Sequence, residues 1–368
     1  MTGTLRVDRQ QMLAYRIAAQ QLDRVDQRPA ELAVLDLGVQ DTPYGSARLA
    51  LAARTSAELD DESLALVWAA RGAPHLHRRA ELPRIAEALW PLSDADAAKR
   101  IVSTQIRDAG KLGLVAFEAA ADAFSAAVAA EPMAKGEVSS AVTARVPAEV
   151  TYPCRSCQST HISGALFQQA GLAGGAQLTV VGGKTMIAPV SDWAGRPRAA
   201  TGTADLIATY LRLLGPATLA EAARHVGTSQ AELRPVWPEG LTEVTVDGRR
   251  TWLPTDRIDA LRSAPPPRLV RLLPAGDPYL SARDRDVLVP DKTRQSEVWR
   301  VLGNPGALLV DGEIMGVWRA KLAGRGRLDV TVAPFEPLSD RVRSAVDDEA
   351  RVLAQARGAT DVRVSQVE

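Results

Sequence analysis

Three adjacent polar residues, Gln40, Asp41 and Thr42, are the first candidates for chemistry in this chain. They follow the apolar run VLDLGV, and Pro43 and Gly45 then turn the chain, so the three side chains would project together from one fixed loop. An amide, a carboxyl and a hydroxyl held in this way could orient a water molecule and stabilise a developing positive charge. The same letters are also a common turn sequence, and on these residues alone we prefer the turn.

A second candidate is the CRSC segment, in which Cys154 and Cys157 are followed by His161. Thiolates and imidazole are the ligands that Zn²⁺ prefers, but a structural zinc site normally has four of them. A fourth ligand could come from elsewhere in the chain, from His75, His77 or His225. The alternative of a redox dithiol lacks the βαβ pattern that usually surrounds one. We therefore expect two half-buried thiols at a turn after Pro153, with no metal and no cofactor.

Other catalytic signatures are missing from the sequence. It contains no Walker loop and no GxGxxG, HExxH or GxSxG motif. Their absence disfavours nucleotide-driven, metalloprotease and serine-hydrolase activities.

Residues 204–254 give the clearest structural pattern. Apolar residues at helical spacing fill 204–214, and capping boxes begin a second helix at Thr218 and a third over 229–236. Two β-rich arms then flank Asp247-Gly248, which favours a type I′ hairpin turn. This is the element order of a winged helix, in which the third helix enters the DNA major groove and the hairpin touches the backbone. The alternative is a winged helix used only for protein contacts or packing.

Two earlier regions repeat parts of this pattern. We expect helices at about 96–108, 114–130 and 135–145. A helix and a Gly182-Gly183 hairpin within 165–190 could form a second wing. An amphipathic helix near 7–20 opens the N-terminal region, which then alternates strands and helices.

A run of three prolines, Pro265–Pro267, should be extended and stiff, and it separates a mostly helical part from a strand-rich one. Asp311-Gly312 predicts a hairpin there, and a helix at about 339–357 follows. We predict an α+β protein with tandem winged-helix (helix-turn-helix) domains and a small C-terminal antiparallel β-barrel or sheet with a terminal helix. The expected domains cover residues 1–95, 96–200, 201–264 and 265–368.

Composition limits the class of protein. The chain has 368 residues, of which 46% are hydrophobic, which suffices for ordinary globular cores. Because no long apolar run and no apolar signal segment occurs, we expect a soluble cytoplasmic protein. Its 44 basic residues, 38 of them Arg, balance 44 acidic ones, which at first argues against nucleic acid. The sum does not fix the distribution, however, and an Arg-lined concave face could bind DNA while acids elsewhere cancel the total.

Several segments also carry a family resemblance. In chain order they are LDLGVQDTP with ARLALAAR, then LVWAARGAPHLH, LLPAGDPYLSARDRDVLVPD and ALLVDGEIMGVWR. Together they resemble winged-helix DNA glycosylases of the AlkZ/YcaQ type, from about residue 5 to residue 358. The segment TYPCRSCQSTHISGALFQQAGL resembles an actinobacterial branch of that family. The resemblance implies three winged helices in a C-shape plus a small β-domain, with double-stranded DNA held in the concave face by a monomer.

The resemblance also implies an activity, the cleavage of the N-glycosidic bond of alkylated or crosslinked purines. The family's catalytic motif, Gln-x-Gln or Gln-x-Asp, aligns on Gln40, Asp41 and Thr42, so these are the candidate catalytic residues. An N7-alkylated purine is already cationic, and the enzyme mainly has to stabilise the sugar cation and orient a water. Gln40 suits that task, but Thr42 departs from the pattern because it stands where the second Gln or Asp should be; it can accept a hydrogen bond but carries no charge. Either Asp41 and Thr42 rebuild the site, or the substrate differs, or activity has been lost.

DNA contacts are expected from basic residues in several elements. His75 in RGAPHLH matches a family position near the lesion, although it could equally be a satisfied loop histidine. The full expected set is Arg54, Arg71, His75, Arg145, Arg249 and Arg250. We expect four of these to lie on one side of the molecule with Gln40 at its centre, namely Arg71, Arg145, Arg249 and Arg250.

Three functional hypotheses follow. The first is a monofunctional DNA-repair glycosylase that needs no cofactor. The second is a non-catalytic winged-helix DNA-binding protein, such as a regulator or lesion sensor. The third is a family scaffold without a DNA role. The Gln-Asp-Thr triplet leaves the first two open, and we favour a glycosylase-like DNA-binding protein.

Overall fold

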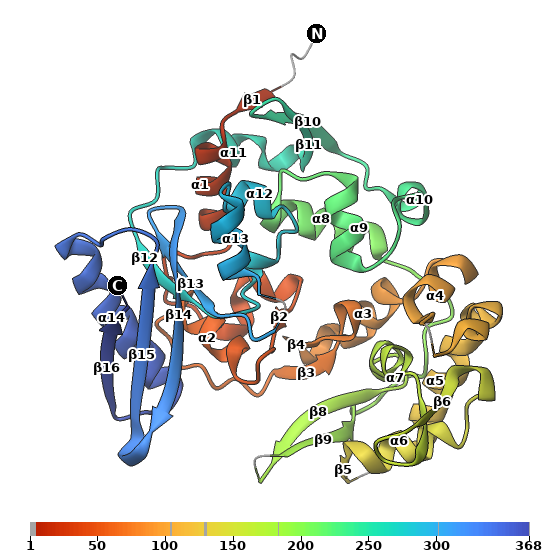
Figure 1. Cartoon of the computed structure of the whole chain (residues 1–368). Coiled ribbons are helices and arrows are strands. Elements are labelled where there is room, and N and C mark those ends of the chain that lie inside the picture. Colours follow the sequence, from red (N-terminus) through yellow and green to blue (C-terminus); the bar gives the residue numbers. More distant parts are fainter. Residues whose placement is uncertain (1–4, 104, 129–130, 183, 301, 368) are drawn as a thin grey trace. The chain divides into compact units, whose positions relative to one another are not determined.

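A computed structural model describes residues 5–103, 105–128, 131–182, 184–300 and 302–367 (Figure 1). The chain divides into two compact units. Unit 1 comprises Met1–Asp61, Thr209–Glu221 and Gly240–Glu368, and unit 2 comprises Glu62–Ala208 and Ala222–Glu239. Both flanks of the three prolines belong to unit 1. Within the described ranges, none of the helices has the length and apolar character needed to cross a membrane.

The N-terminal part of unit 1 is tied to a hairpin far along the chain. Strand β1 (Leu5–Val7) pairs in parallel with β10 (Leu241–Val246), which pairs antiparallel with β11 (Arg249–Pro254). Between β10 and β11, Asp247 and Gly248 have φ of +46° and +82°, as a type I′ turn requires, so the predicted turn is confirmed. Helix α1 (Arg9–Ala19) begins after Asp8, whose carboxylate accepts the Gln11 N–H at 2.7 Å.

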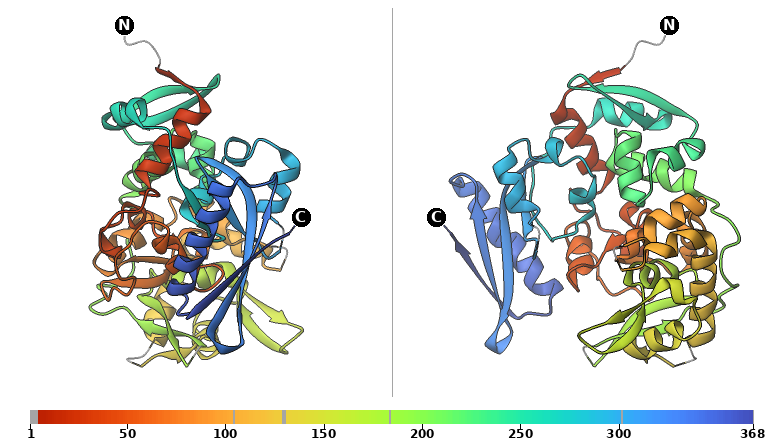
Figure 2. Two further views of the ribbon diagram at one scale, coloured as in Figure 1. Left: turned by 90° about the vertical axis from the view of Figure 1, so that its left-hand side faces the viewer. Right: turned by 45° about the vertical axis from the view of Figure 1, so that its right-hand side comes forward.

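Unit 1 also contains a five-stranded sheet in the order β12-β13-β14-β15-β16. These strands are Val270–Leu273, Gly306–Val310, Glu313–Ala323, Arg327–Pro334 and Asp361–Gln366. Helix α14 (Asp340–Ala356) lies along one face of the sheet (Figure 2) and buries Val346 and Leu353 there. The predicted closing helix is therefore present. The sheet is not wholly antiparallel, because β16 follows α14 and pairs in parallel with β15. Sequence analysis missed this last strand.

Shorter elements complete unit 1. Strand β2 (Val39–Gln40) precedes α2 (Ser46–Ala52), and α11 (Ile258–Ser263) follows the β10–β11 hairpin. Helices α12 (Arg285–Leu288) and α13 (Lys292–Val298) lie between β12 and β13 in the sequence.

Unit 2 contains a sheet with the strand order β4-β3-β8-β9-β5. In that order the strands are Pro74–Arg78, Leu64–Trp68, Ala176–Val181, Lys184–Pro189 and Met133–Ala134. Its helices are α3 (Leu82–Leu89), α4 (Asp94–Ile101), α5 (Leu114–Ala127), α6 (Lys135–Thr143) and α7 (Gly164–Gly171). Trp68, Phe124 and Phe167 meet in the core of the unit, with ring centroids 4.7 to 6.4 Å apart.

Two predictions in unit 2 concern the end of α4 and the Gly182-Gly183 turn. Helix α4 ends at Ile101, well before the expected residue 108, because β-branched Val102 takes up extended backbone directly after it. The Gly182-Gly183 turn lies partly outside the described residues, since Gly183 is not among them. The strands on either side of it, β8 and β9, pair as an antiparallel hairpin.

Helices α8 (Thr203–Leu214), α9 (Leu219–Val226) and α10 (Gln230–Leu233) follow the predicted order. The capping box that begins α9 is confirmed: the Thr218 N–H donates to Glu221 Oε2 at 2.8 Å, and the Glu221 N–H donates to Thr218 Oγ1 at 3.2 Å. The third helix is shorter than expected, because Pro235 lacks an N–H and the chain continues as a 3-10 turn.

The capping box of α10 is only half formed. Ser229 accepts the Glu232 N–H at 3.2 Å as predicted, but the Glu232 carboxylate accepts from the Ser93 hydroxyl at 2.7 Å instead of returning to its own helix start. A partner distant in sequence thus replaces a local one.

Candidate active site

The Gln40–Thr42 segment rests on a glycine from another part of unit 1. Gly276 has φ of +79°, and a Cβ at that position would lie 3.0 Å from the Thr42 carbonyl oxygen and 3.6 Å from Gln40 Cδ. Only glycine combines this backbone conformation with so close an approach. The Ser46 hydroxyl donates to the Gln40 carbonyl at 3.2 Å from the start of α2. Gln40 is therefore positioned from two sides while its side chain stays half-buried.

Asp41 faces the opposite way from its neighbours. Its side chain is 8% exposed, and its carboxylate accepts the Ala47 N–H of α2 at 2.9 Å. Burial raises the pKa of Asp41, and hydrogen bonds from the N–H groups of α2 partly oppose that rise. Thr42, in contrast, is exposed. The expectation that three side chains project together is therefore corrected: the Asp41 side chain is buried and binds the first turn of α2, while Thr42 is exposed.

A buried ion pair lies next to Gly276 in the sequence. Asp277 and Arg54 are both 0% exposed, and the two carboxylate oxygens each lie 2.8 Å from a guanidinium nitrogen. Arg54 also donates to the Ala50 carbonyl at 2.8 Å and to Gln20 at 3.1 Å. The expected DNA contact of Arg54 is therefore corrected, because this side chain has no exposed surface and both of its terminal nitrogens already bind groups inside unit 1.

The two arginines after the β10–β11 turn differ in surroundings. The Arg249 guanidinium binds Glu221 and lies 3.9 Å from Asp284, which itself pairs with buried Arg16 at 2.6 Å. Arg250 has 68% of its side chain exposed, and its contacts are with Glu243 at 2.6 Å and the face of Trp252. Alternation along β11 explains the difference, and only Arg250 presents most of its side chain to solvent.

Three expected DNA contacts lie in unit 2. Arg71 has φ of +59° and donates to the His225 carbonyl. His75, on β4, is 5% exposed, with its Nδ1 2.8 Å from the Ala73 carbonyl oxygen. Arg145 follows α6, is exposed, and donates to the Ala141 carbonyl at 2.7 Å. Of these three, Arg145 is the side chain most open to a partner.

Two further residues belong to this description: Tyr44, which sequence analysis did not single out, and His77, which it considered only as a possible zinc ligand. Tyr44 is 68% exposed and follows Thr42 by two residues, so the loop carries an aromatic ring on the surface. A tyrosine in the turn sequence between Pro43 and Gly45 was the available signal, because turns and loops run over the protein surface. His77 on β4 is fully buried, and burial lowers its pKa to about 3, so the imidazole is neutral.

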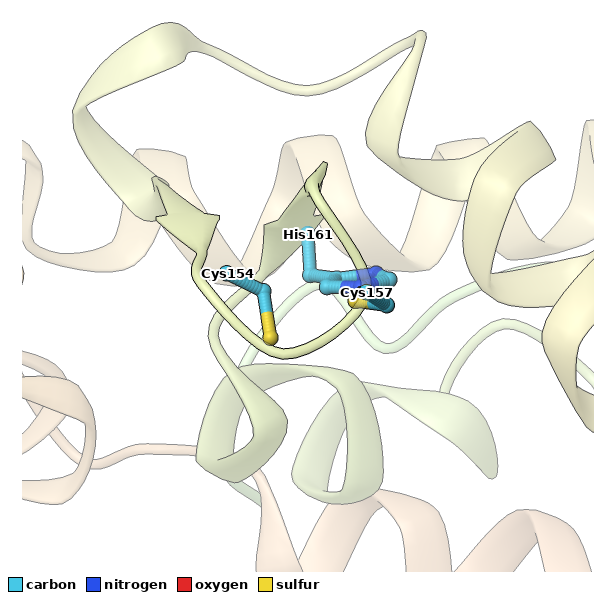
Figure 3. Close-up of side chains that lie close together, drawn as sticks. All are labelled: Cys154, Cys157 and His161. Atoms are coloured by element: carbon cyan, nitrogen blue, oxygen red, sulfur yellow. Dashed lines mark hydrogen bonds between the residues drawn. The ribbon is translucent and has the colours of Figure 1, made fainter.

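The second candidate cluster lies on a hairpin of unit 2. Strands β6 (Thr151–Cys154) and β7 (Ser159–Ile162) pair antiparallel and bring the two thiols and His161 together (Figure 3). Their ligand atoms all lie within 4.8 Å of one another, and no fourth histidine, cysteine or carboxylate joins them in the described part of the chain. Hydrogen bonds from the Ser156 hydroxyl and from backbone N–H groups lower the pKa of Cys154 to about 6. Cys154 is half-buried as expected, whereas Cys157 is exposed.

Comparisons with known proteins place these features in context. The sequence model of the family described as "DNA glycosylase AlkZ-like" matches residues 16–356. The interstrand DNA cross-link repair glycosylase of Streptomyces sahachiroi is 30% identical over 184 residues, which are 47% of this chain and 48% of that protein, so the match spans about half of the relative. The solved structure of Streptomyces sahachiroi DNA glycosylase AlkZ matches with a TM-score of 0.77 and 23% identity, covering 99% of this chain and 100% of that one. This match confirms the mixed α+β architecture with several sheets.

Proposed function

Since this chain belongs to the AlkZ-like DNA glycosylase family, we propose that it binds duplex DNA and hydrolyses the N-glycosidic bond of N7-alkylated or crosslinked purines. The observation that carries the proposal is the family match over residues 16–356. It is supported by the close approach of Gly276 to Gln40, the residue that the resemblance aligns with the catalytic motif. The relative from Streptomyces sahachiroi is named for interstrand cross-link repair, which supports crosslinked purines as one substrate class.

The proposed reaction needs little acid catalysis. The N7-alkylated base carries a positive charge, and when the C1′–N9 bond breaks its electron pair neutralises that charge. The sugar becomes an oxocarbenium-like cation, a water oxygen adds to C1′, and the water loses a proton to solvent. Gln40 orients that water through its amide, because Gly276 and Ser46 hold the residue in place.

The other two motif positions have separate roles in this proposal. Thr42 is exposed beside Gln40 and accepts a hydrogen bond from the water or the sugar. Asp41 is a positioning residue, because its carboxylate caps α2 and thereby fixes the start of the loop. Catalysis then rests on Gln40 with help from Thr42.

DNA binding is proposed for the expected basic residues that keep some exposed surface. Arg250 and Arg145 would contact phosphates, and Arg249 and Arg71 would do so from positions already held by protein partners. His75 is buried and stays a predicted contact near the lesion. Their gathering on one side around Gln40 stays a prediction. Binding of this kind weakens steeply with salt because phosphate contacts release counterions.

The finer architecture is also part of the proposal. We assign α8, α9, α10 and the β10–β11 hairpin to a winged helix, supported by the pairing of Ala217 with Trp252 on β11, which extends the small sheet. We also propose four domains, at residues 1–95, 96–200, 201–264 and 265–368. Limited proteolysis at Pro265–Pro267 tests the last of these boundaries. We further propose that the protein acts as a monomer.

One observation favours a second candidate, a non-catalytic DNA-binding protein. Thr42, a neutral hydroxyl, stands where the family motif has Gln or Asp, and the carboxyl of the neighbouring Asp41 is buried. A lesion sensor would need Tyr44 and the cations but not an activated water.

A single duplex separates the two candidates. The protein is incubated in excess over DNA with one N7-methylguanine, and abasic sites are measured beside binding at rising salt. Salt-sensitive binding with base release supports the glycosylase, and salt-sensitive binding without release supports the sensor. Absence of salt-sensitive binding contradicts both.

A further inference from the structure

We propose that Cys154, Cys157 and His161 bind one Zn²⁺ ion at the tip of the β6–β7 hairpin, with the fourth coordination position left to water or an external ligand. The sequence showed only an incomplete ligand set. The structure adds that the three residues converge at one point (Figure 3). This inference is independent of any activity on DNA.

The distances suit a tetrahedral ion. Zinc lies about 2.3 Å from sulfur and about 2.0–2.1 Å from nitrogen, so neighbouring ligand atoms of a tetrahedral site are about 3.6 to 3.8 Å apart. The three ligand atoms here already lie within 4.8 Å of one another. Cys157 Sγ and His161 Nε2 are 2.8 Å apart and would have to separate by less than 1 Å. Side-chain rotation alone can make these adjustments while the strand register stays unchanged.

The backbone of the turn favours the meeting of the three ligands. Cys154 ends β6, and Gln158, directly after Cys157, has φ of +50°. This left-handed residue helps to reverse the chain, so that β7 pairs with β6 and His161 lies opposite Tyr152. The two thiols and the imidazole are thereby held within 4.8 Å of one another.

A redox dithiol fits the same hairpin less well. A reactive CxxC pair typically lies at the N-terminus of a helix, whereas these cysteines end one strand and precede another. The dithiol also assigns no role to His161, whose ring nitrogen meets Cys157 Sγ. Metal binding uses all three groups.

The placement of the cluster indicates what the ion would do. The base of the hairpin is anchored, since Val150 and Ile162 are buried and the Ile162 N–H donates to Thr143 Oγ1 at 3.0 Å. The tip, residues 155–160, is exposed throughout and has no apolar core of its own. A zinc ion would link the two strands at this tip, where no apolar side chains pack together. Its binding energy would then stabilise the hairpin.

Cobalt substitution gives the most direct test. The full-length protein is reduced, stripped of metal with a chelator, and titrated with Co²⁺ and then with Zn²⁺. We expect one equivalent of Co²⁺ to give sulfur-to-metal charge-transfer and strong tetrahedral d–d absorption, which one equivalent of Zn²⁺ then removes. Cys157→Ser and His161→Ala should weaken the affinity at least about 100-fold, because second-shell changes alone cost 10–100-fold. Thr160→Ala, an exposed neighbour on β7, is the matched control and should bind normally.

His161→Cys keeps the test decisive if the alanine variant is poorly folded. Three thiolates still form a tetrahedral site, so this variant should retain the charge-transfer band, with far-UV circular dichroism confirming its fold. The proposal is overturned if reduced protein gives no charge-transfer band, if the cobalt spectrum is octahedral, or if Cys157→Ser binds as tightly as the unaltered chain.

Discussion

The buried pair Arg54–Asp277 supports a quantitative prediction about unit 1. Asp277→Asn keeps the shape of the side chain but removes its charge, and it leaves the Arg54 guanidinium buried without a counterion. Both side chains are 0% exposed, and two charge-assisted bonds of 2.8 Å join them. Breaking a buried pair by removing one partner costs about 3–5 kcal/mol of the free energy of unfolding. We expect a loss in that range.

Two comparisons isolate the cause. Replacing both partners, as Arg54→Met with Asp277→Leu, should recover much of the loss, because no buried charge is then left unpaired. The surface pair Arg48–Asp60 provides the control, since its side chains are 39% and 74% exposed. Asp60→Asn should cost less than about 1 kcal/mol because solvent screens exposed pairs.

Urea unfolding followed by far-UV circular dichroism measures all four proteins. The number and steepness of the transitions in the urea curve show whether unit 1 and unit 2 unfold together. The curve is then fitted with one transition or with two. If Asp277→Asn costs less than about 1 kcal/mol, or if the double variant is no more stable than the single one, burial of an uncompensated charge is not the controlling effect.

Three further predictions concern the candidate site. Asp41→Asn should raise stability at neutral pH: burial raises the pKa of Asp41, so folding favours its protonated form, and that contribution is lost as pH rises through the folded-state pKa. Melting temperatures from pH 4 to 7 test this, and a less stable variant at pH 7 would count against it. Gly276→Ala should cost about 1–3 kcal/mol because φ is +79° and the new methyl meets Thr42, and urea unfolding measures it. Arg250→Gln should weaken DNA binding and reduce the slope of log affinity against log salt by about 1, measured by fluorescence anisotropy, whereas an unchanged slope would exclude a phosphate contact.

Local signals were read correctly from the sequence. The Thr218 capping box and the Asp247-Gly248 turn both depend on residues within a few positions of one another, and the structure contains both. Helix α14 follows from apolar periodicity that needs no distant partner. Strand β16 was missed because it is stabilised by pairing with β15, which lies beyond an intervening helix.

The burial and orientation of side chains whose partners lie far away in the sequence could not be predicted. Arg54 is buried because Asp277, 223 positions away, neutralises it, and nothing near Arg54 in the sequence announces that partner. Asp41 turns inward because α2 begins five residues later and offers the Ala47 N–H to its carboxylate. The cysteine cluster was visible as a motif, but its convergence depends on the β6–β7 register, which places His161 opposite Tyr152.

The central claim is that Gln40 acts on the glycosidic bond of an alkylated purine. Single-turnover release of N7-methylguanine, measured for the unaltered chain and Gln40→Ala at equal DNA occupancy, tests it most directly. Loss of one transition-state hydrogen-bonding group typically lowers the rate by about 100- to 1,000-fold, and we expect a loss of that size with unchanged DNA affinity. Equal release by the two proteins, or no release by the unaltered chain, would contradict the claim.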